Sequence, residues 1–91
     1  MKLPKLVWDR WNKEHIKKHK VTVAEVEEAY TRHQLELKGK RGRAEIISKI
    51  RNGRMITIFL SFDQQLRPYV VSARDASKKE RSIYYEKIHE A

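Results

Sequence analysis

Hydrophobic and polar positions between residues 8 and 20 sort onto opposite sides of one helix. At about 100° per residue, one arc of about 140° collects aromatic rings, an amide and an aliphatic side chain. Its members are Trp8, Trp11, Asn12, His15, Ile16 and His19. Asp9 is expected to cap this helix, which should end near His19. The helix could supply proton-transfer groups and phosphate-binding charge together, or it could be a core helix with polar tips.

Two further helices are predicted from capping boxes, in which a Ser or Thr precedes a Glu by three residues. Thr22 and Glu25 open a helix from residue 23 to about His33, and Ser77 and Glu80 open a last helix that runs to about residue 89. Residues 5–8 are expected to form a short strand. A basic loop is expected over residues 38–43.

Strands are predicted over residues 44–51, 54–62 and 69–74, with one more at residues 35–37. Asn52-Gly53 between the first two is a strong hairpin signal. The order is therefore β-α-α-β-β-β-α with a possible extra strand. We expect a single α+β domain over residues 1–91, in which an antiparallel twisted sheet of 3–5 strands follows two N-terminal helices and precedes one C-terminal helix.

A two-residue turn at Asn52-Gly53 would set the register of the hairpin. Arg51 would then face Arg54, and Ile47 would face Ile58. Both faces would be apolar in the middle, so helices or a partner are expected to cover parts of each. Opposed like charges cost about 0.2–1 kcal/mol. The two arginines could bind one phosphate or carboxylate between them, or both could extend into water.

Composition narrows the class of partner. The 91 residues include 21 basic and 12 acidic side chains, for a net charge of +9, and no cysteine. This charge favours a nucleic acid or an acidic protein as partner, although it could also be a solubilising surface. No apolar run approaches the ~20 residues that cross a bilayer, and residues 1–5 lack the apolar stretch of a secretory signal. The sequence therefore predicts a cytoplasmic protein that does not bind membranes.

Three stretches resemble the BrnT family of toxins, and together they span nearly the whole chain. The first is Trp8-Asp9-x-Trp11-Asn12-x-x-His15-Ile16-x-x-His19-x-Val21-Thr22, continued by Glu25-Val26-Glu27-Glu28. The second is Val71-Ser72-Ala73-Arg74-Asp75-Ala76-Ser77-Lys78-Lys79-Glu80-Arg81, followed by Tyr84-Tyr85. The third is the hairpin Ile50-Arg51-Asn52-Gly53-Arg54. Members of the family usually carry glycine after the Lys-His pair, where a left-handed C-cap suits it, and this chain has Lys20 there.

The resemblance implies the toxin of a type II toxin–antitoxin pair. Such a toxin is a small ribonuclease with a RelE-like fold that cuts RNA without a metal or other cofactor. Its partners would be RNA and a cognate antitoxin, a small DNA-binding protein that inhibits the toxin in a hetero-oligomer and represses their operon. Lys18 and His19 correspond to the Lys-His pair of the family.

Cleavage without metal requires activation of the ribose 2′-hydroxyl, stabilisation of the phosphorane and protonation of the leaving oxygen. We expect Lys18 and His19 to transfer protons and Arg51, Arg54 and Arg74 to hold the scissile phosphate, since arginine suits bidentate phosphate contact. Further contacts to RNA are expected from Arg81 and Tyr85. The alternatives are a solvated Lys18, a structural His19 packed in the core, and an Arg74 that is paired with a carboxylate such as Asp75 or Glu80.

The sequence also allows a metal site and two functions other than a ribonuclease to be considered. His15 and His19 at i,i+4 suggest a zinc site, but Glu14 is in the wrong order for the usual motif and no third ligand is evident, so no metal is expected. A module of the same fold could bind RNA or an antitoxin without cutting. A DNA-binding regulator has little support, because no helix-turn-helix pattern is present.

Overall fold

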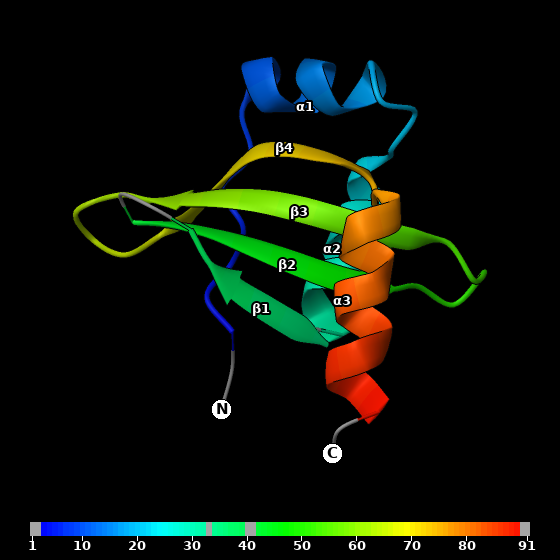
Figure 1. Ribbon diagram of the computed structural model, residues 1–91. Helices are drawn as coiled ribbons and strands as arrows, with labels where there is room; N and C mark the ends of the chain where they lie inside the picture. The colour runs from blue at the N-terminus through cyan, green and yellow to red at the C-terminus, as the bar shows by residue number, and fades with distance from the viewer. Residues whose placement is uncertain (1–2, 33, 40–41, 90–91) are drawn as a thin grey trace.

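In the part of the chain that the structure describes, four antiparallel strands form one sheet, with helices on both faces and along one edge (Figure 1). This computed structural model describes residues 3–32, 34–39 and 42–89. The elements are α1 (Arg10–Lys17), α2 (Val23–Arg32), β1 (Leu35–Lys38), β2 (Arg43–Lys49), β3 (Met55–Phe62), β4 (Pro68–Asp75) and α3 (Lys78–His89). The sheet order is β1-β2-β3-β4, and the expected α+β architecture is confirmed. Within the described ranges, no helix has the length and apolar character needed to cross a bilayer.

Helix α1 runs along the β4 edge and is fastened there by a buried amide. Asp9 caps the helix as expected, since its carboxylate accepts from the Asn12 backbone N–H at 2.9 Å. The fully buried Asn12 amide nitrogen donates to the carbonyl oxygens of Val7 and Val70, both at 3.0 Å. The expected strand over residues 5–8 is wrong. Val7 makes a single parallel bridge to Tyr69, and its carbonyl is bound by the amide rather than by a sheet ladder.

Both predicted capping boxes are confirmed. Thr22 Oγ1 accepts from the Glu25 N–H at 3.1 Å, and the Glu25 carboxylate accepts from the Thr22 N–H at 3.0 Å. Ser77 and Glu80 make the same two bonds at 3.1 and 2.8 Å. The expected end of the second helix, His33, lies outside the described residues, as do Lys40 and Arg41 of the expected basic loop.

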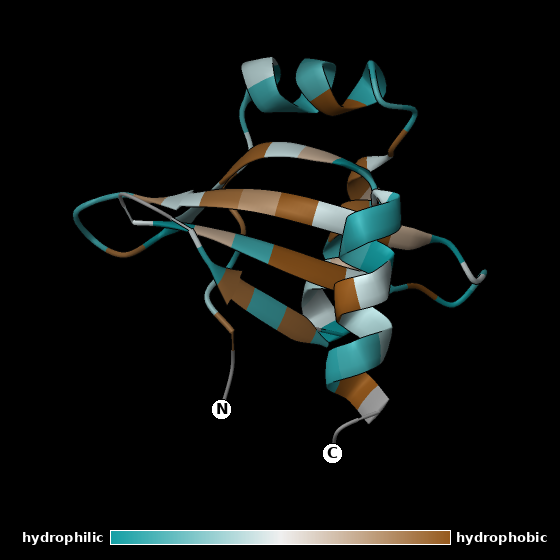
Figure 2. Ribbon diagram, viewed as in Figure 1, coloured by the Kyte–Doolittle hydropathy of each residue, from teal (hydrophilic) through white to brown (hydrophobic). Residues whose placement is uncertain are grey.

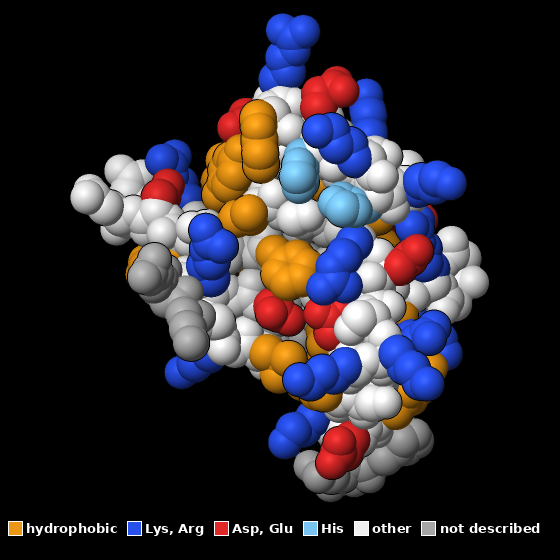
Figure 3. Space-filling model, turned by 45° about the horizontal axis from the view of Figure 1, so that its top comes forward, with side chains coloured by type: hydrophobic (Ala, Val, Ile, Leu, Met, Phe, Trp, Pro, Cys, Tyr) orange, Lys and Arg blue, Asp and Glu red, His pale blue; other side chains and the backbone are white. Residues whose placement is uncertain are grey.

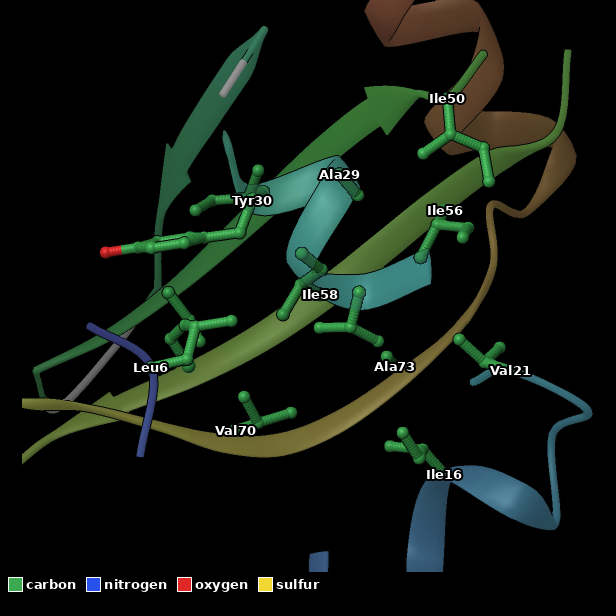
Figure 4. Packing of buried hydrophobic residues seen from close by; sticks show 13 residues of the cluster. Leu6, Ile16, Val21, Ala29, Tyr30, Ile50, Ile56, Ile58, Val70 and Ala73 are labelled. Carbon is green, nitrogen blue, oxygen red and sulfur yellow. The ribbon is translucent and has the colours of Figure 1, made fainter. Parts of the chain in front are cut away.

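The main core fills the space between α2 and the back face of the sheet, as we call the face that α2 covers (Figure 4). Its buried members are Leu6, Ile16, Val21, Val26, Ala29, Tyr30, Ile46, Ile50, Ile56, Ile58, Leu60, Val70 and Ala73. On the opposite or front face, α3 packs against β1 and β2 over a smaller cluster of Ile47, Met55 and Tyr84. Hydrophobic residues are concentrated in the strands, whereas α1 and α3 are mainly hydrophilic (Figure 2). The expectation that both faces are partly covered is confirmed.

The register of the β2–β3 hairpin differs from the prediction by one residue. Lys49 pairs with Met55, and Ile46 pairs with Ile58. The turn has three residues, 51–53, because the Ile50 N–H donates to the Arg54 carbonyl at 2.8 Å. Gly53 has φ +92°, which suits the third position of a three-residue loop, where a left-handed residue follows a type I turn. The expected pairing of Arg51 with Arg54 is therefore wrong.

Burial explains why this register is adopted. In the predicted register Glu45 and Lys49 of β2 would share a face with Ile56, Ile58 and Leu60 of β3. In the observed register Ile46 and Ile50 lie on that face instead, and all of these isoleucines are buried. A shift of one residue moves a whole strand's side chains to the other face, so apolar burial decides between the two turns.

Loss of the buried amide in an Asn12→Ala variant is expected to destabilise the fold by about 2–4 kcal/mol, because two buried carbonyl groups lose their donor. The free energy of unfolding, measured by chemical denaturation, checks this. Asn52→Ala makes the same change at the exposed hairpin tip and should cost less than about 1 kcal/mol. A similar loss in the two variants would contradict the anchoring role of Asn12.

Candidate functional site

Arg74 lies on the front face of the sheet in a bidentate ion pair. Its Nη1 and Nη2 donate to the two carboxylate oxygens of Glu80 at 2.8 and 3.0 Å. Its guanidinium carbon lies 5.0 Å from the centroid of the Phe59 ring. The side chain stays 35% exposed. A guanidinium has five N–H donors, and two of them, on Nε and Nη2, make no hydrogen bond to the described residues.

Glu80 is a fixed carboxylate that orients this guanidinium. Burial would raise the pKa of Glu80, but hydrogen bonds from Arg74, from the Ser77 N–H and from the Thr57 hydroxyl outweigh burial and lower the pKa below its ordinary value. The group therefore stays ionised at neutral pH and cannot act as a general acid there. The ion pair that is the alternative role of Arg74 is present, and two donors of the guanidinium make no hydrogen bond to the described residues.

Lys18 and His19 lie in the turn that ends α1, and both side chains are exposed. Lys18 is the C-cap, and the His19 N–H donates to the Ile16 carbonyl at 3.0 Å. Lys20 then takes φ +59°, the left-handed conformation that the family usually gives to glycine. Neither Lys18 nor the imidazole of His19 hydrogen-bonds through its side chain to the described part of the chain. His19 is therefore not a core histidine here.

Helix α1 and strand β4 run in the same direction along one edge of the sheet (Figure 1). Near their starts, the Tyr69 hydroxyl donates at 2.9 Å to the carboxylate of Asp9, the N-cap of α1. Lys18 and His19 follow the C-terminal end of α1, and Arg74 is the last residue but one of β4, so all three lie toward the same end of this edge. Figure 3 shows the histidine side chains of α1 among Lys and Arg side chains, above a front face that is open between α1 and α3.

A hollow of about 440 Å³ indents this open part of the front face. Its lining residues are Gly39, Arg43, Ala44, Glu45, Phe59, Val71 and Ser72. Phe59 belongs to both features, since its ring lines the hollow and lies beside the Arg74 guanidinium. The hollow thus extends the surface around Arg74 toward a second arginine, Arg43.

The hairpin arginines lie apart from this surface. Arg54 is on the back face, where its Nε donates to Asp75 at 2.5 Å and its Nη1 contacts Glu25 at 3.0 Å. Its side chain is 24% exposed, so a phosphate would have to displace two carboxylates. Arg51 is exposed at the hairpin tip, and its backbone N–H donates to Glu28 at 2.5 Å. The structure does not bring these two arginines together with Arg74.

The two α3 candidates lie on the front side of the molecule. Arg81 is exposed, and its charge helps to lower the pKa of Asp75, for which the main cause is the hydrogen bond from Arg54. Tyr85 is 44% exposed and lies edge-on to Tyr84 at 5.3 Å. Tyr84 itself is buried, as expected, whereas Tyr85 is exposed, with Lys49 Nζ 6.0 Å from its ring centroid.

Two aromatic residues of this surface were missed from the sequence. Phe59 was placed on the face shared with Ile46, and the correct hairpin register moves it to the front face beside Arg74. Trp11 was grouped with the apolar arc of its helix, yet it is 57% exposed. Because α1 lies along an edge, it buries only Asn12 and Ile16. The i,i+4 spacing of Trp11 and His15 was the signal available.

Acid should weaken the fold through its paired carboxylates. The pKa values of Glu25, Asp75 and Glu80 are lowered in the folded state, so the folded protein binds fewer protons than the unfolded chain. Their stabilisation is complete above the ordinary values of 3.8 for Asp and 4.5 for Glu, and is lost as pH falls through the lowered values. Thermal unfolding between pH 7 and 2 measures this loss.

Glu80→Gln isolates one of these groups. At pH 7 it should cost about 1–2 kcal/mol, because a charged partner of Arg74 is removed from a partly exposed pair. Its stability should also fall less steeply in acid. Glu86→Gln removes a charge from an exposed position of the same helix and should change stability by less than about 0.5 kcal/mol. If the stability of the parent and of the Glu80→Gln variant fell in parallel as the pH is lowered, Glu80 would not be one of the carboxylates that stabilise the fold.

The front surface thus combines a partly free guanidinium with ammonium, imidazole and aromatic groups. Such groups bind anions and transfer protons. Among the described residues, no group of three or more His, Asp or Glu side chains is arranged to hold a metal ion. No protein-family model, curated protein or solved structure matches this chain.

Proposed function

We propose that this protein is the toxin of a type II toxin–antitoxin pair, a RelE-like ribonuclease that cleaves RNA in the cytoplasm without a metal. The observation that supports this most is the parallel course of α1 and β4 from their common start at Asp9 and Tyr69. With both elements running the same way, the exposed Lys18 and His19 after α1 and the oriented guanidinium of Arg74 near the end of β4 lie toward the same end of this edge.

The three groups match the needs of the reaction. His19 accepts the proton of the ribose 2′-hydroxyl, whose oxygen attacks the adjacent phosphorus. Arg74 binds the phosphate through the two N–H donors that Glu80 and Asp75 leave unbonded, and stabilises the charge that develops there. Lys18 donates a proton to the leaving 5′-oxygen. Glu80 is a positioning residue, because it holds Arg74 by two parallel hydrogen bonds without reaching the substrate itself.

The antitoxin partner follows from the same surface. A net charge of +9 and an open basic front face favour an acidic protein segment as inhibitor. Such a segment would occupy the face that RNA needs, which explains neutralisation by simple competition. Arg81 and Tyr85 on α3 would contribute outer contacts to RNA or to the antitoxin, and the exposed Arg51 at the hairpin tip would add a more distant one.

A second candidate is a module of this fold that binds RNA or an antitoxin and cuts nothing. The ion pairs of Arg54 and Arg74 favour it, since a guanidinium already bound to a carboxylate offers less charge to a phosphorane. Incubation of the purified protein with RNA in the presence of a chelator distinguishes the two functions. Cleavage identifies the enzyme, whereas salt-sensitive retention of intact RNA identifies the binder.

The double substitution Lys18→Ala/His19→Ala is expected to lower the rate of RNA cleavage by about 10²–10⁴-fold, the usual contribution of general acid–base catalysis. Toxicity to growing cells should be lost with it. Both side chains are exposed, so the thermal midpoint should stay near that of the parent. Cleavage is measured on a labelled RNA in the presence of a chelator.

Lys20→Gly is the matched control, because it removes one positive charge from the same turn. It should retain cleavage, and it should stabilise the fold slightly, since glycine adopts φ +59° without the cost that lysine has there. Unchanged cleavage in the double variant, or equal loss in the control, would rule out the assigned proton-transfer roles.

A further inference from the structure

The exposed face of α1 carries a row of three aromatic rings. Trp11 and His15 are stacked, with ring centroids 4.8 Å apart and planes within 9° of each other. His15 in turn meets His19 edge-on at 5.5 Å. The spacing of four residues places the three rings one turn apart on the same side of the helix.

Trp11 is held in place but open to solvent. It is 57% exposed, although burying so large a side chain would stabilise the fold. One face of its ring rests on His15, which limits the rotamers of Trp11, and the other part of the ring borders a hollow of about 420 Å³. The lining residues are Arg10, Trp11, Glu14, His15 and Lys18. A ring fixed in this way loses little entropy on binding a flat partner.

Two exposed basic side chains, Arg10 and Lys18, line the same hollow as Trp11 and His15, together with one acidic residue, Glu14. Neither Arg10 nor Lys18 contacts a carboxylate of the described residues, whereas Glu14 is paired with Lys17 at 3.5 Å. A groove that pairs aromatic rings with unpaired cations is the usual device for single-stranded nucleic acid, in which bases stack and phosphates are bound by charge.

We propose that Trp11 and His15 form a stacking platform for an unpaired base of single-stranded RNA. This inference takes its ligand from the proposed function, and it adds a subsite and a preference for single strands. The His15 ring contacts those of Trp11 and His19, whose centroids are therefore at most about 10 Å apart. The platform therefore holds a nucleotide neighbouring the reacting phosphate. Paired bases cannot use it, because their faces are already stacked within the duplex.

Binding of a labelled 12-nucleotide oligo(dA) tests the platform without cleavage, since the probe has no 2′-hydroxyl to attack. Trp11→Ala is expected to weaken its binding by about 5- to 150-fold, the value of one base–aromatic stack. Trp11→Phe should restore most of the affinity. The dependence of binding on salt should be unchanged, because no phosphate contact is removed. Leu66→Ala, which truncates an exposed apolar residue of the β3–β4 connection, should leave binding unchanged.

Several outcomes would overturn the inference. One is that the parent does not bind the probe, and another is that Trp11→Ala loses less than twofold in affinity for it. A third is that Trp11→Ala loses as much affinity for a duplex of the same sequence as for the single strand. A change in self-association alone would identify the row as a protein contact instead. The two proposals fail separately: a parent that binds the probe through Trp11 but leaves RNA intact keeps the platform and loses the ribonuclease. A parent that cleaves RNA but does not bind the probe through Trp11 supports the ribonuclease and rules out the platform.

Discussion

The buried amide of Asn12 determines where α1 lies, and the candidate groups on that helix take their positions from it. The Asn12 side-chain oxygen accepts from the N–H of Asp9, the N-cap residue of the same helix. Its amide nitrogen donates to the carbonyl oxygens of Val7 and Val70. These bonds hold α1 along an edge of the sheet rather than across a face. An edge helix buries a narrow strip, so Trp11 and His19 stay exposed. The accessibility of the aromatic row is thus a result of this anchoring contact.

Two arginine networks use the same chemistry on opposite faces of the sheet and reach different results. Arg54 is bound by carboxylates from α2 and from the end of β4, in a part of the back face that is already covered. Arg74 is bound by one carboxylate from α3, on a part of the front face that is open. In the first network, the two carboxylates and the elements that carry them enclose the charged group. The second leaves an oriented charge at the surface, where a ligand can reach it.

Local patterns predicted the helices well, because capping boxes depend on side chains three residues apart. The pairs Thr22–Glu25 and Ser77–Glu80 are of this kind. The hairpin was harder, since Asn52-Gly53 is compatible with a two-residue turn and with a three-residue turn that ends at Gly53. The choice depends on which β2 residues share a face with the isoleucines of β3, and that burial is not a local property. Phe59 was missed for this reason, and Trp11 was missed because an edge position is set by Asn12.

The pairing of Arg74 with Glu80 does not by itself oppose a role in catalysis. A charged group stabilises a transition state best when it is oriented before the reaction, because no reorganisation is then needed. Two parallel hydrogen bonds from Glu80 supply that orientation, and the lowered pKa of Glu80 keeps them in place at neutral pH. The cost is repulsion between the carboxylate and an incoming phosphate. In the proposed site an unpaired lysine such as Lys18 offsets that repulsion, so the charge at the end of the neighbouring helix matters to Arg74 as well as its own ion pair.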